Sequence, residues 1–456
     1  MRNWQRLFGL LPPAVMLATL GMADVSLGAA IPQVKAGENH TVMLRANGAI
    51  WTCGDNFLGQ LGDGTTTARD VPTRLGTATD WVDISAGLYH TMALKADGSL
   101  WAWGDNTYGQ LGIGTADLVQ LTPVQVGTDK NWKSVSAGDY HTVAMKTDGT
   151  LWAWGDSADG TLGTGETYSG IIVPTPTQIG AETNWVAAAT GNDHTMAVKA
   201  DGTLWGWGSN QVGQLGDETN LEGRAPIKIG ADTDWAAVTN RGSQTVARKK
   251  NGTLFTWGLN ADGQLGDGTS INKDLPTKVN DDANWTAISS GKNHSVALKD
   301  DGTLLAWGDN EDGQCGDGKV ELKIATPKPI GTTKDFVALD AGELHTVVMK
   351  KNGTIWAMGD NTLGQLCNGT NAASLTPSPG ISPNSGDMDV NGDVALADAL
   401  RALRVTVGLS TPVATEVIAG DVGPLTADNV PAPDGAVTIN DAVVILRKVV
   451  GLVTSF

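Results

Sequence analysis

Residues 84–95 read Ile84-Ser-Ala-Gly-Leu-Tyr-His90-Thr-Met-Ala-Leu-Lys95, and near copies of this stretch recur along the chain. The other copies are Val34–Arg45, Val135–Lys146, Ala188–Lys199, Ile288–Lys299 and Leu339–Lys350, and a seventh copy has Gln244 in place of the histidine. Six copies contain all six histidines of the chain: His40, His90, His141, His194, His294 and His345. The sequence is therefore organised as seven repeats of about fifty residues.

Each repeat also contains an Asx-Gly pair between two apolar segments, as at Asp97-Gly98. Such a pair predicts a β-hairpin with a two-residue type I′ turn, in which both turn residues have positive φ. Residues 81–85 before the hairpin and 123–127 after it add two further strands. Seven four-stranded units predict a mainly β, seven-bladed β-propeller. An open solenoid is the alternative, but it requires polar terminal caps that these repeats lack.

The two ends of the repeat array suggest how the ring closes. The first repeat begins at Ile31, and the last one ends at residues 377–381. We expect residues 31–35 to join the sheet that residues 377–381 complete.

Residues kept in every repeat are interpreted as architecture. A core histidine that hydrogen-bonds to neighbouring backbone at the inner strand is favoured over a metal ligand, because each histidine occupies the same repeat position. The repeated tryptophans, such as Trp81 and Trp103, are expected to pack between blades. Cys53, Cys315 and Cys367 replace repeat residues and are interpreted as buried small substitutions, too few for a disulfide framework.

Residues that the repeats do not keep are the candidates for binding. The two residues between the motif glycine and the histidine vary freely, and they would line one face around the axis if the histidine strand lies near it. Leu88, Tyr89, Asp139 and Tyr140 are predicted to bind a protein partner there, because aromatic side chains are common binding anchors. The alternative is that they are ordinary turn residues. The fifth repeat is irregular, with Arg241 in place of the motif glycine.

Composition and charge narrow the function classes. The 456 residues include 59 Gly and 16 Trp, and 31 Lys and Arg against 49 Asp and Glu give a net charge of −18. A surface this acidic repels phosphate backbones, so we expect no nucleic-acid partner. We expect the chain to be a monomer.

The first thirty residues have the pattern of a secretory signal peptide. Arg2 and Arg6 precede an apolar run over residues 7–23, and small residues follow at 28–30. Cleavage after Ala30 is favoured over cleavage after Ala23. We therefore expect export to the medium or the cell envelope, with no membrane span after cleavage. An uncleaved anchor and a core helix are the alternatives, and prolines 12 and 13 argue against both.

The repeat motifs resemble a known family. Gly87-Leu-Tyr-His90-Thr and Gly54-Asp-Asn-Phe-Leu-Gly-Gln-Leu-Gly62 look like the two signatures of the regulator of chromosome condensation repeat, found in seven-bladed propellers. The resemblance covers residues 31–381 and implies the propeller fold. It leaves the function open, because members of that family serve as exchange factors, scaffolds and inhibitors.

A second domain is predicted over residues 386–456, after a linker at 382–385. Residues 386–398 read Gly-Asp-Met-Asp-Val-Asn-Gly-Asp-Val-Ala-Leu-Ala-Asp, with oxygen ligands and a glycine at the spacing of a calcium-binding loop. A related loop and helix follow 43 residues later. A solvated acidic turn is the alternative for the first loop.

This α-helical, EF-hand-like pair resembles a dockerin module, which binds calcium and docks enzymes onto cohesin domains. The resemblance implies calcium ligands at Asp387, Asp389, Asn391, Asp393 (through its carbonyl), Asp398, Asp421, Asp434 and Asp441. It also implies a cohesin-like partner for the tail, although Leu396-Ala397 stands where dockerins carry a polar recognition pair.

Taken together, the sequence favours an exported, non-enzymatic protein-binding or scaffold propeller with a calcium-binding, dockerin-type tail. One alternative is a component of a polysaccharide-degrading complex, in which Glu38, Asp139, Asp193 and Glu343 would be candidate glycosidase carboxylates. Another is an inhibitor of a secreted enzyme. Guanine-nucleotide exchange is a remote alternative, since export and the lack of a long insert argue against it.

Overall fold

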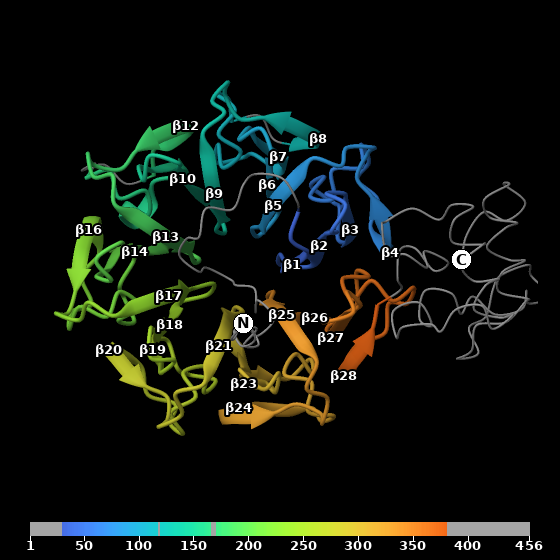
Figure 1. Cartoon of the computed structure of the whole chain (residues 1–456), viewed down its shortest axis with the longest axis vertical. Helices are drawn as coiled ribbons and strands as arrows, with labels where there is room; N and C mark the ends of the chain where they lie inside the picture. The colour runs from blue at the N-terminus through green and yellow to red at the C-terminus, as the bar shows by residue number, and fades with distance from the viewer. Residues whose placement is uncertain (1–29, 117–118, 166–169, 381–456) are drawn as a thin grey trace, which may run out of the picture.

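The computed structural model describes residues 30–116, 119–165 and 170–380. In these ranges the chain forms seven four-stranded antiparallel sheets arranged as blades around a central axis (Figure 1). This confirms the predicted seven-bladed β-propeller. The predicted signal peptide, linker and calcium-binding domain lie outside the described residues, apart from Ala30.

Each blade is built from one contiguous repeat, and its four strands follow one another in chain order from the axis outward. Blades 1 to 3 are β1 (Gln33–Ala36), β2 (His40–Leu44), β3 (Ile50–Gly54), β4 (Arg69–Arg74); β5 (Trp81–Ala86), β6 (His90–Lys95), β7 (Leu100–Asp105), β8 (Val119–Gln125); and β9 (Trp132–Ala137), β10 (His141–Lys146), β11 (Leu151–Asp156), β12 (Ile172–Gln178). Blades 4 and 5 are β13 (Trp185–Thr190), β14 (His194–Lys199), β15 (Leu204–Gly208), β16 (Gly223–Ile229); and β17 (Trp235–Thr239), β18 (Gln244–Lys249), β19 (Leu254–Gly258), β20 (Lys273–Lys278). Blades 6 and 7 are β21 (Trp285–Ser290), β22 (His294–Lys299), β23 (Leu304–Asn310), β24 (Glu321–Pro329); and β25 (Phe336–Ala341), β26 (His345–Lys350), β27 (Ile355–Gly359), β28 (Ser374–Pro379).

The strand nearest the axis is the one before the histidine strand, not the histidine strand itself (Figure 1). The loops between these two strands nevertheless lie around the axis, and the variable residues lie on them. We call the side with these loops and the Gly-rich loops the loop face, and the side with the Asx-Gly turns the hairpin face.

The hairpins occur where predicted, but the turn type is different. In blade 2 the Lys95 amide donates to the Ser99 carbonyl (3.0 Å), and the Gly98 amide donates to the Lys95 carbonyl (2.9 Å). Gly98 has a φ of 80°, whereas Asp97 does not have positive φ. The loop therefore has three residues and matches a type I turn followed by a glycine bulge. Asp97 contributes through its side chain, which accepts the Ser99 amide at 3.0 Å.

A buried hydroxyl group joins each blade to the one before it. Thr91 Oγ1 of blade 2 donates to the Gln60 carbonyl of blade 1 (2.9 Å) and lies 3.1 Å from His40 Nε2. Trp103 Nε1 donates to the same carbonyl at 2.9 Å. Since the hydroxyl proton points to the carbonyl, the hydroxyl oxygen accepts a hydrogen bond from the imidazole N–H.

The same histidine–hydroxyl contact recurs at five more boundaries: His90–Thr142, His141–Thr195, His194–Thr245, His294–Thr346 and His345–Thr41, each at 2.8–3.2 Å. The structural interpretation of the histidines is thus confirmed, with a side-chain hydroxyl of the next blade as partner instead of backbone. At the remaining boundary Gln244 Nε2 donates to the Gly291 carbonyl at 2.7 Å.

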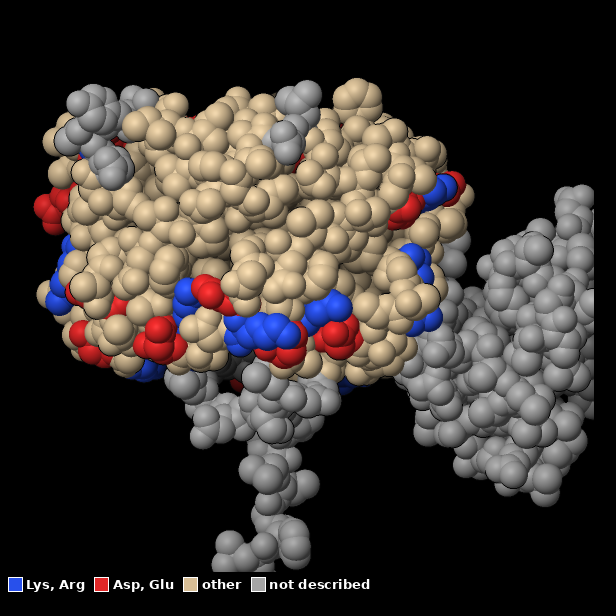
Figure 2. Space-filling view, turned by 90° about the horizontal axis from the view of Figure 1, so that it is seen from above, with Lys and Arg blue, Asp and Glu red and all other residues tan. Residues whose placement is uncertain are grey.

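The tryptophans pack at the blade boundaries as expected. Trp81 belongs to a core cluster with Val42 and Ile50 of blade 1. Its ring meets Trp101 edge-on at 6.1 Å, and the Lys95 ammonium lies 4.8 Å from the Trp81 ring. Similar lysine–aromatic contacts recur at the hairpin end of the later blades, where the lysines also pair with acids. Charged residues accordingly gather along one edge of the propeller wall (Figure 2).

The predicted closure by a shared sheet is wrong. β1 pairs with β2 of its own repeat, with Val34 opposite Met43, and β28 pairs with β27. The first repeat has enough apolar alternation to complete its own sheet, so no strand is exchanged. The last blade instead joins the first through the standard boundary, in which Thr41 Oγ1 donates to the Gln365 carbonyl at 2.8 Å.

This closing boundary carries a disulfide, which corrects the interpretation of the cysteines as buried substitutions. Cys53 stands where blades 2 to 6 have Trp103 or its equivalents and blade 7 has Met358, and Cys367 stands where blades 1 to 6 have a glycine under that side chain. The two are bonded, with their Cα atoms 5.7 Å apart and a sequence separation of 314 positions. Cys367 has a φ of 56°, so it keeps the left-handed backbone of the glycine that it replaces. Cys315 is free and buried, as predicted.

The disulfide predicts a reductant-dependent stability. Replacing Cys53 with serine, or adding a reductant, should lower the free energy of unfolding by about 2–4 kcal/mol, because the ring loses its covalent closure. The double variant Cys53→Trp/Cys367→Gly restores the usual tryptophan–glycine pair and should be stable with no response to reductant. Denaturant unfolding with and without dithiothreitol measures both effects, with Cys315→Ser as the control. An equal midpoint for the oxidised and reduced wild-type chain would refute the prediction.

The buried histidines predict that the free energy of unfolding falls at low pH. Burial lowers the pKa of His141 to about 4, so the unfolded chain takes up a proton between pH 6.5 and 4 that the folded chain does not. The contribution of this histidine to the free energy of unfolding is full above pH 6.5. Below that pH it falls by up to about 1.4 kcal/mol per pH unit. The His141→Gln variant should therefore be about 1 kcal/mol less stable than wild type at pH 7.5. We expect the order to reverse near pH 4.5 in urea titrations, and a constant difference would contradict this.

Candidate functional site

The loops between the first and second strands of the blades form a rigid circle on the loop face, with backbone hydrogen bonds at six of the seven boundaries and the Gln244 side chain at the boundary of blades 5 and 6. Backbone amides of one loop donate to carbonyls of the next, as from Glu38 to Leu88 (3.3 Å) and from Leu88 to Gly138 (3.2 Å). The bond from Glu343 to Glu38 (3.4 Å) carries the circle across the closing boundary. Side chains on these loops are therefore held in fixed positions before any partner binds.

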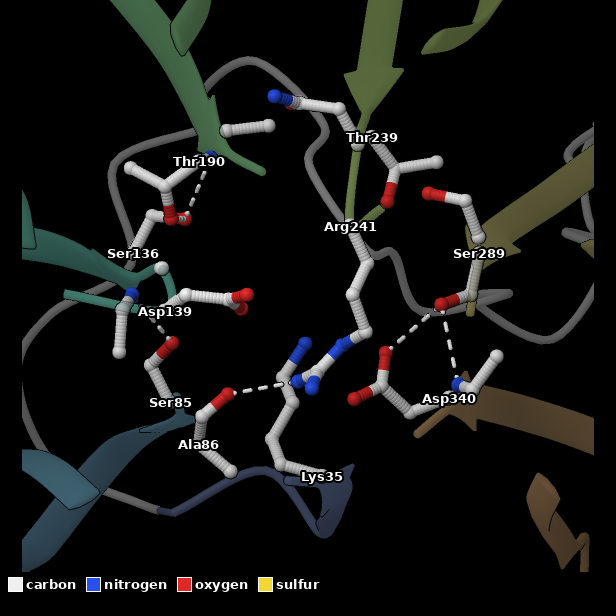
Figure 3. A pocket seen from close by; sticks show the side chains of 16 residues that line it. Lys35, Ser85, Ala86, Ser136, Asp139, Thr190, Thr239, Arg241, Ser289 and Asp340 are labelled. Carbon is white, nitrogen blue, oxygen red and sulfur yellow. Dashed lines mark hydrogen bonds between the residues drawn. The ribbon is translucent and has the colours of Figure 1, made fainter. Parts of the chain in front are cut away.

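The structure places the four predicted binding residues on two neighbouring loops of this circle. Leu88 and Tyr89 lie between β5 and β6, and Asp139 and Tyr140 lie between β9 and β10, all of them half-buried. The Tyr140 ring is 4.9 Å from the ring of Tyr108, which comes from the Gly-rich loop after β7. Asp139 differs from the other three, because its carboxyl group points into the cavity on the axis (Figure 3).

Two glutamates from the first and last blades complete this part of the loop face. The carboxyl groups of Glu38 and Glu343 are within hydrogen-bonding range of each other, and the Tyr89 hydroxyl bonds to Glu38. Lys292 of blade 6 pairs with Glu343. The sequence showed both glutamates as candidates on the axis, but their contact depends on ring closure and could not be seen in either repeat alone. Tyr108 was missed because it belongs to a different loop of the repeat.

Burial shifts the acids of this region strongly. Burial, with the hydrogen bond to Glu343, raises the pKa of Glu38 to about 8. Burial also raises the pKa of Asp139 to about 7 and that of Asp193 to about 6. The pKa of Tyr89 rises for the same reason and through its bond to Glu38. The loop face thus holds carboxyl groups that are only partly ionised at neutral pH.

Arg241 fills the axis. Its guanidinium crosses from blade 5 to donate to the carbonyls of Ala36 (2.5 Å) and Ala86 (2.8 Å) in blades 1 and 2 (Figure 3). It borders a polar cavity of about 90 Å³, lined by Lys35, Asp139 and hydroxyl groups of the innermost strands. Asp340 closes another side of this cavity, where it accepts from the Ala36 amide and from Ser289, each at 2.9 Å.

The two irregularities of blade 5 form a coupled pair. In the other six blades a Cβ on the motif glycine would lie 2.1–2.9 Å from the histidine ring. Blade 5 has Gln244 instead of the ring, and its flexible amide leaves room for the Arg241 side chain. The exchange of histidine for glutamine therefore permits the arginine that fills the axis.

Comparison with known proteins agrees with this geometry. The family model of the RCC1-like domain matches residues 13–238 and 118–386. The chain belongs to the RCC1-like domain family.

Proteins similar in sequence to this RCC1-like chain include a receptor, a ligase and a regulator of chromosome condensation. The ultraviolet-B receptor UVR8 of Arabidopsis thaliana is 31% identical over 187 residues, which are 40% of this chain and 42% of the receptor. The probable E3 ubiquitin-protein ligase HERC3 of Homo sapiens is 38% identical over 196 residues, 42% of this chain and 19% of the ligase. The human regulator of chromosome condensation is 36% identical over 99 residues, 21% of this chain and 23% of that protein. Each alignment spans less than half of the relative.

Solved structures match the RCC1-like propeller in fold. Human WBSCR16 has a TM-score of 0.67 at 22% identity, covering 74% of this chain and 94% of that one. Yeast RCC1 (Prp20), in a structure with Kap60, has a TM-score of 0.66 at 19% identity, covering 83% and 92%. At these identities the likeness concerns the fold alone.

The coupled pair in blade 5 can be tested by a double-mutant cycle. Gln244→His alone should destabilise the propeller by about 1–3 kcal/mol, because the imidazole then meets the side chain of Arg241. Adding Arg241→Gly should recover most of this loss, since the blade then has the glycine–histidine pair of the other six. Denaturant unfolding of both single variants and the double variant gives the coupling energy. Additive effects would show that the two positions are independent.

Proposed function

We propose that this chain is an exported, non-enzymatic protein-binding propeller whose partner binds the loop face at Leu88, Tyr89, Asp139 and Tyr140. The observation that carries the proposal is the position of the two tyrosines on adjacent loops of a hydrogen-bonded circle. Rigid, half-buried tyrosines lose little conformational entropy on binding and offer both apolar area and a hydroxyl group.

The chemistry of the loop face supports binding over glycoside hydrolysis. Retaining and inverting glycosidases separate their two carboxyl groups by about 5–5.5 Å or 6.5–9.5 Å. Glu38 and Glu343 interact directly and shift each other's pKa values, unlike the separated acid pair of a glycosidase. Their interaction supports a role in surface electrostatics.

The disulfide supports export. Disulfides persist in oxidising compartments, and the Cys53–Cys367 bond closes the ring of a chain that begins with a signal-like segment. We further propose that the tail at residues 386–456 binds calcium and attaches the exported monomer, with a cohesin-like domain as its candidate partner. This part of the proposal rests on the sequence alone.

The test is capture of a partner from the culture medium by the mature chain, with and without a calcium chelator. We expect Tyr89→Ala/Tyr140→Ala to weaken binding of the recovered protein by at least about 2 kcal/mol while the melting temperature stays nearly unchanged. The matched control is Leu221→Ala/Ile271→Ala, which removes two exposed aliphatic side chains from blades 4 and 5.

Two outcomes would overturn the proposal. The first is normal binding by the tyrosine double variant combined with loss of capture when residues 386–456 are deleted. The tail would then be the recognition device, as expected for a component of a polysaccharide-degrading complex. The second is hydrolysis of a polysaccharide by the mature chain, abolished by Asp139→Asn or Asp193→Asn.

A further inference from the structure

Five side chains lie on neighbouring loops of the loop face, and we call them the tyrosine–glutamate arc: Glu343, Glu38, Tyr89, Tyr140 and Tyr108. They come from four consecutive blades of the closed ring, namely blades 7, 1, 2 and 3. Glu343 contacts Glu38, Glu38 accepts a hydrogen bond from Tyr89, and the Tyr140 and Tyr108 rings pack at 4.9 Å. Tyr108 is 37% exposed, so the aromatic end of the arc is open to solvent.

The arc has more carboxyl groups than cationic side chains to pair with them. Lys292 pairs with Glu343. The guanidinium of Arg241 donates its hydrogen bonds to two carbonyl groups of the inner strands. Within the described residues, Oε2 of Glu38 and Oε2 of Glu343 are buried and have no hydrogen-bond partner. The hairpin face is different, because its acids are paired with lysines that lie on tryptophan rings. The arc therefore combines aromatic rings with carboxyl oxygens, as the hairpin face does, but its rings are tyrosines and, within the described residues, it lacks a second cation.

We propose that the arc binds a lysine or arginine side chain that projects from the partner protein. Its charged group would contact the two carboxyl groups, and its methylene chain would lie against the tyrosine rings. This inference rests on the proposed protein-binding function and specifies the chemistry of the partner. A basic side chain satisfies both features at once, since carboxylates pair with it and tyrosine faces attract it. An acidic side chain would be repelled, and an apolar one would leave the carboxyl oxygens without a donor.

Binding of the cation should release a proton. Burial raises the pKa of Glu38 to about 8, so at neutral pH one proton is held between Glu38 and Glu343. An incoming cation favours the ionised form, and the proton leaves to solvent. Affinity should therefore rise about tenfold per pH unit below pH 8 and level off above it.

Few neighbouring groups titrate in the same range. Glu38 interacts with Glu343, Lys292, Tyr89, Tyr140 and His345, and Glu343 also interacts with Arg241 and Asp139. Burial takes the pKa of His345 down to about 3 and raises the pKa values of Tyr89 and Tyr140 above their usual value. Hydrogen bonding to Glu343 raises the pKa of Lys292 against the effect of burial. Asp139, with a pKa of about 7, is the neighbour that must be controlled.

The experiment uses the mature chain with ¹³C-labelled tyrosine rings and three blocked tripeptide probes: acetyl-Gly-Arg-Gly-amide, its lysine analogue and its norleucine analogue. We expect both basic probes to shift the Tyr89 and Tyr140 resonances, with a dissociation constant that falls about tenfold from pH 6 to pH 7. The norleucine probe, which keeps the methylenes without the charge, should give no shift. Glu38→Gln should remove the pH dependence, and Asp139→Asn should retain it.

The outcomes separate this inference from the proposed function. Equal shifts with norleucine, no shift with either basic probe, or an unchanged pH dependence in Glu38→Gln would each overturn the cation site. Shifts of the same resonances by calcium chloride alone, with no response to the basic probes, would also overturn it. The capture experiment with Tyr89→Ala/Tyr140→Ala tests the protein-binding face itself. That face can be confirmed even if the basic probes do not bind.

Discussion

The ring depends on one buried hydroxyl group at each boundary between blades. At the first boundary the Thr91 hydroxyl is a donor to the Gln60 carbonyl and an acceptor for the His40 imidazole, while Trp103 shares that carbonyl. Removing any partner leaves a buried polar group unsatisfied, at a cost of about 1–3 kcal/mol. The residues of this contact therefore repeat from blade to blade. Side chains outside it are free to vary and to take part in recognition.

The departures from the repeat occur as pairs of substitutions at contacting positions. Cys53 replaces a tryptophan and Cys367 replaces the glycine beneath it, so a covalent bond takes the place of ring packing at the closing boundary. In the same way, Gln244 replaces a histidine and Arg241 replaces the glycine that this histidine requires. The first pair closes the ring, and the second fills its axis. Neither member of a pair would be tolerated without the other, because each alone would produce a void, a clash or an unpaired thiol.

The sequence predicted what is local and repeated, but not what depends on contacts between distant repeats. A period of about fifty residues and an Asx-Gly turn in each copy are sufficient for the blade count, the strand order and the hairpins. The turn type was missed because the aspartate acts through its side chain and not through positive φ. The disulfide joins residues 314 positions apart, so nothing within one repeat indicates it. For the site, the variable positions named from the sequence lie together on the loop face, whereas the contact of Glu38 with Glu343 exists only once blades 1 and 7 meet.

The symmetry of the fold also limits how a partner can bind. A site made of repeated residues would be offered seven times around the axis, and a partner could dock in seven equivalent orientations. The tyrosine–glutamate arc occurs once, because four of its residues come from the variable positions of blades 7, 1, 2 and 3 and Tyr108 comes from the Gly-rich loop of blade 2. Arg241 is also unique, and it ties blade 5 to blades 1 and 2 beneath the arc. The repeated contacts therefore supply a rigid frame, and the residues that break the repeat define a single orientation for one partner per propeller.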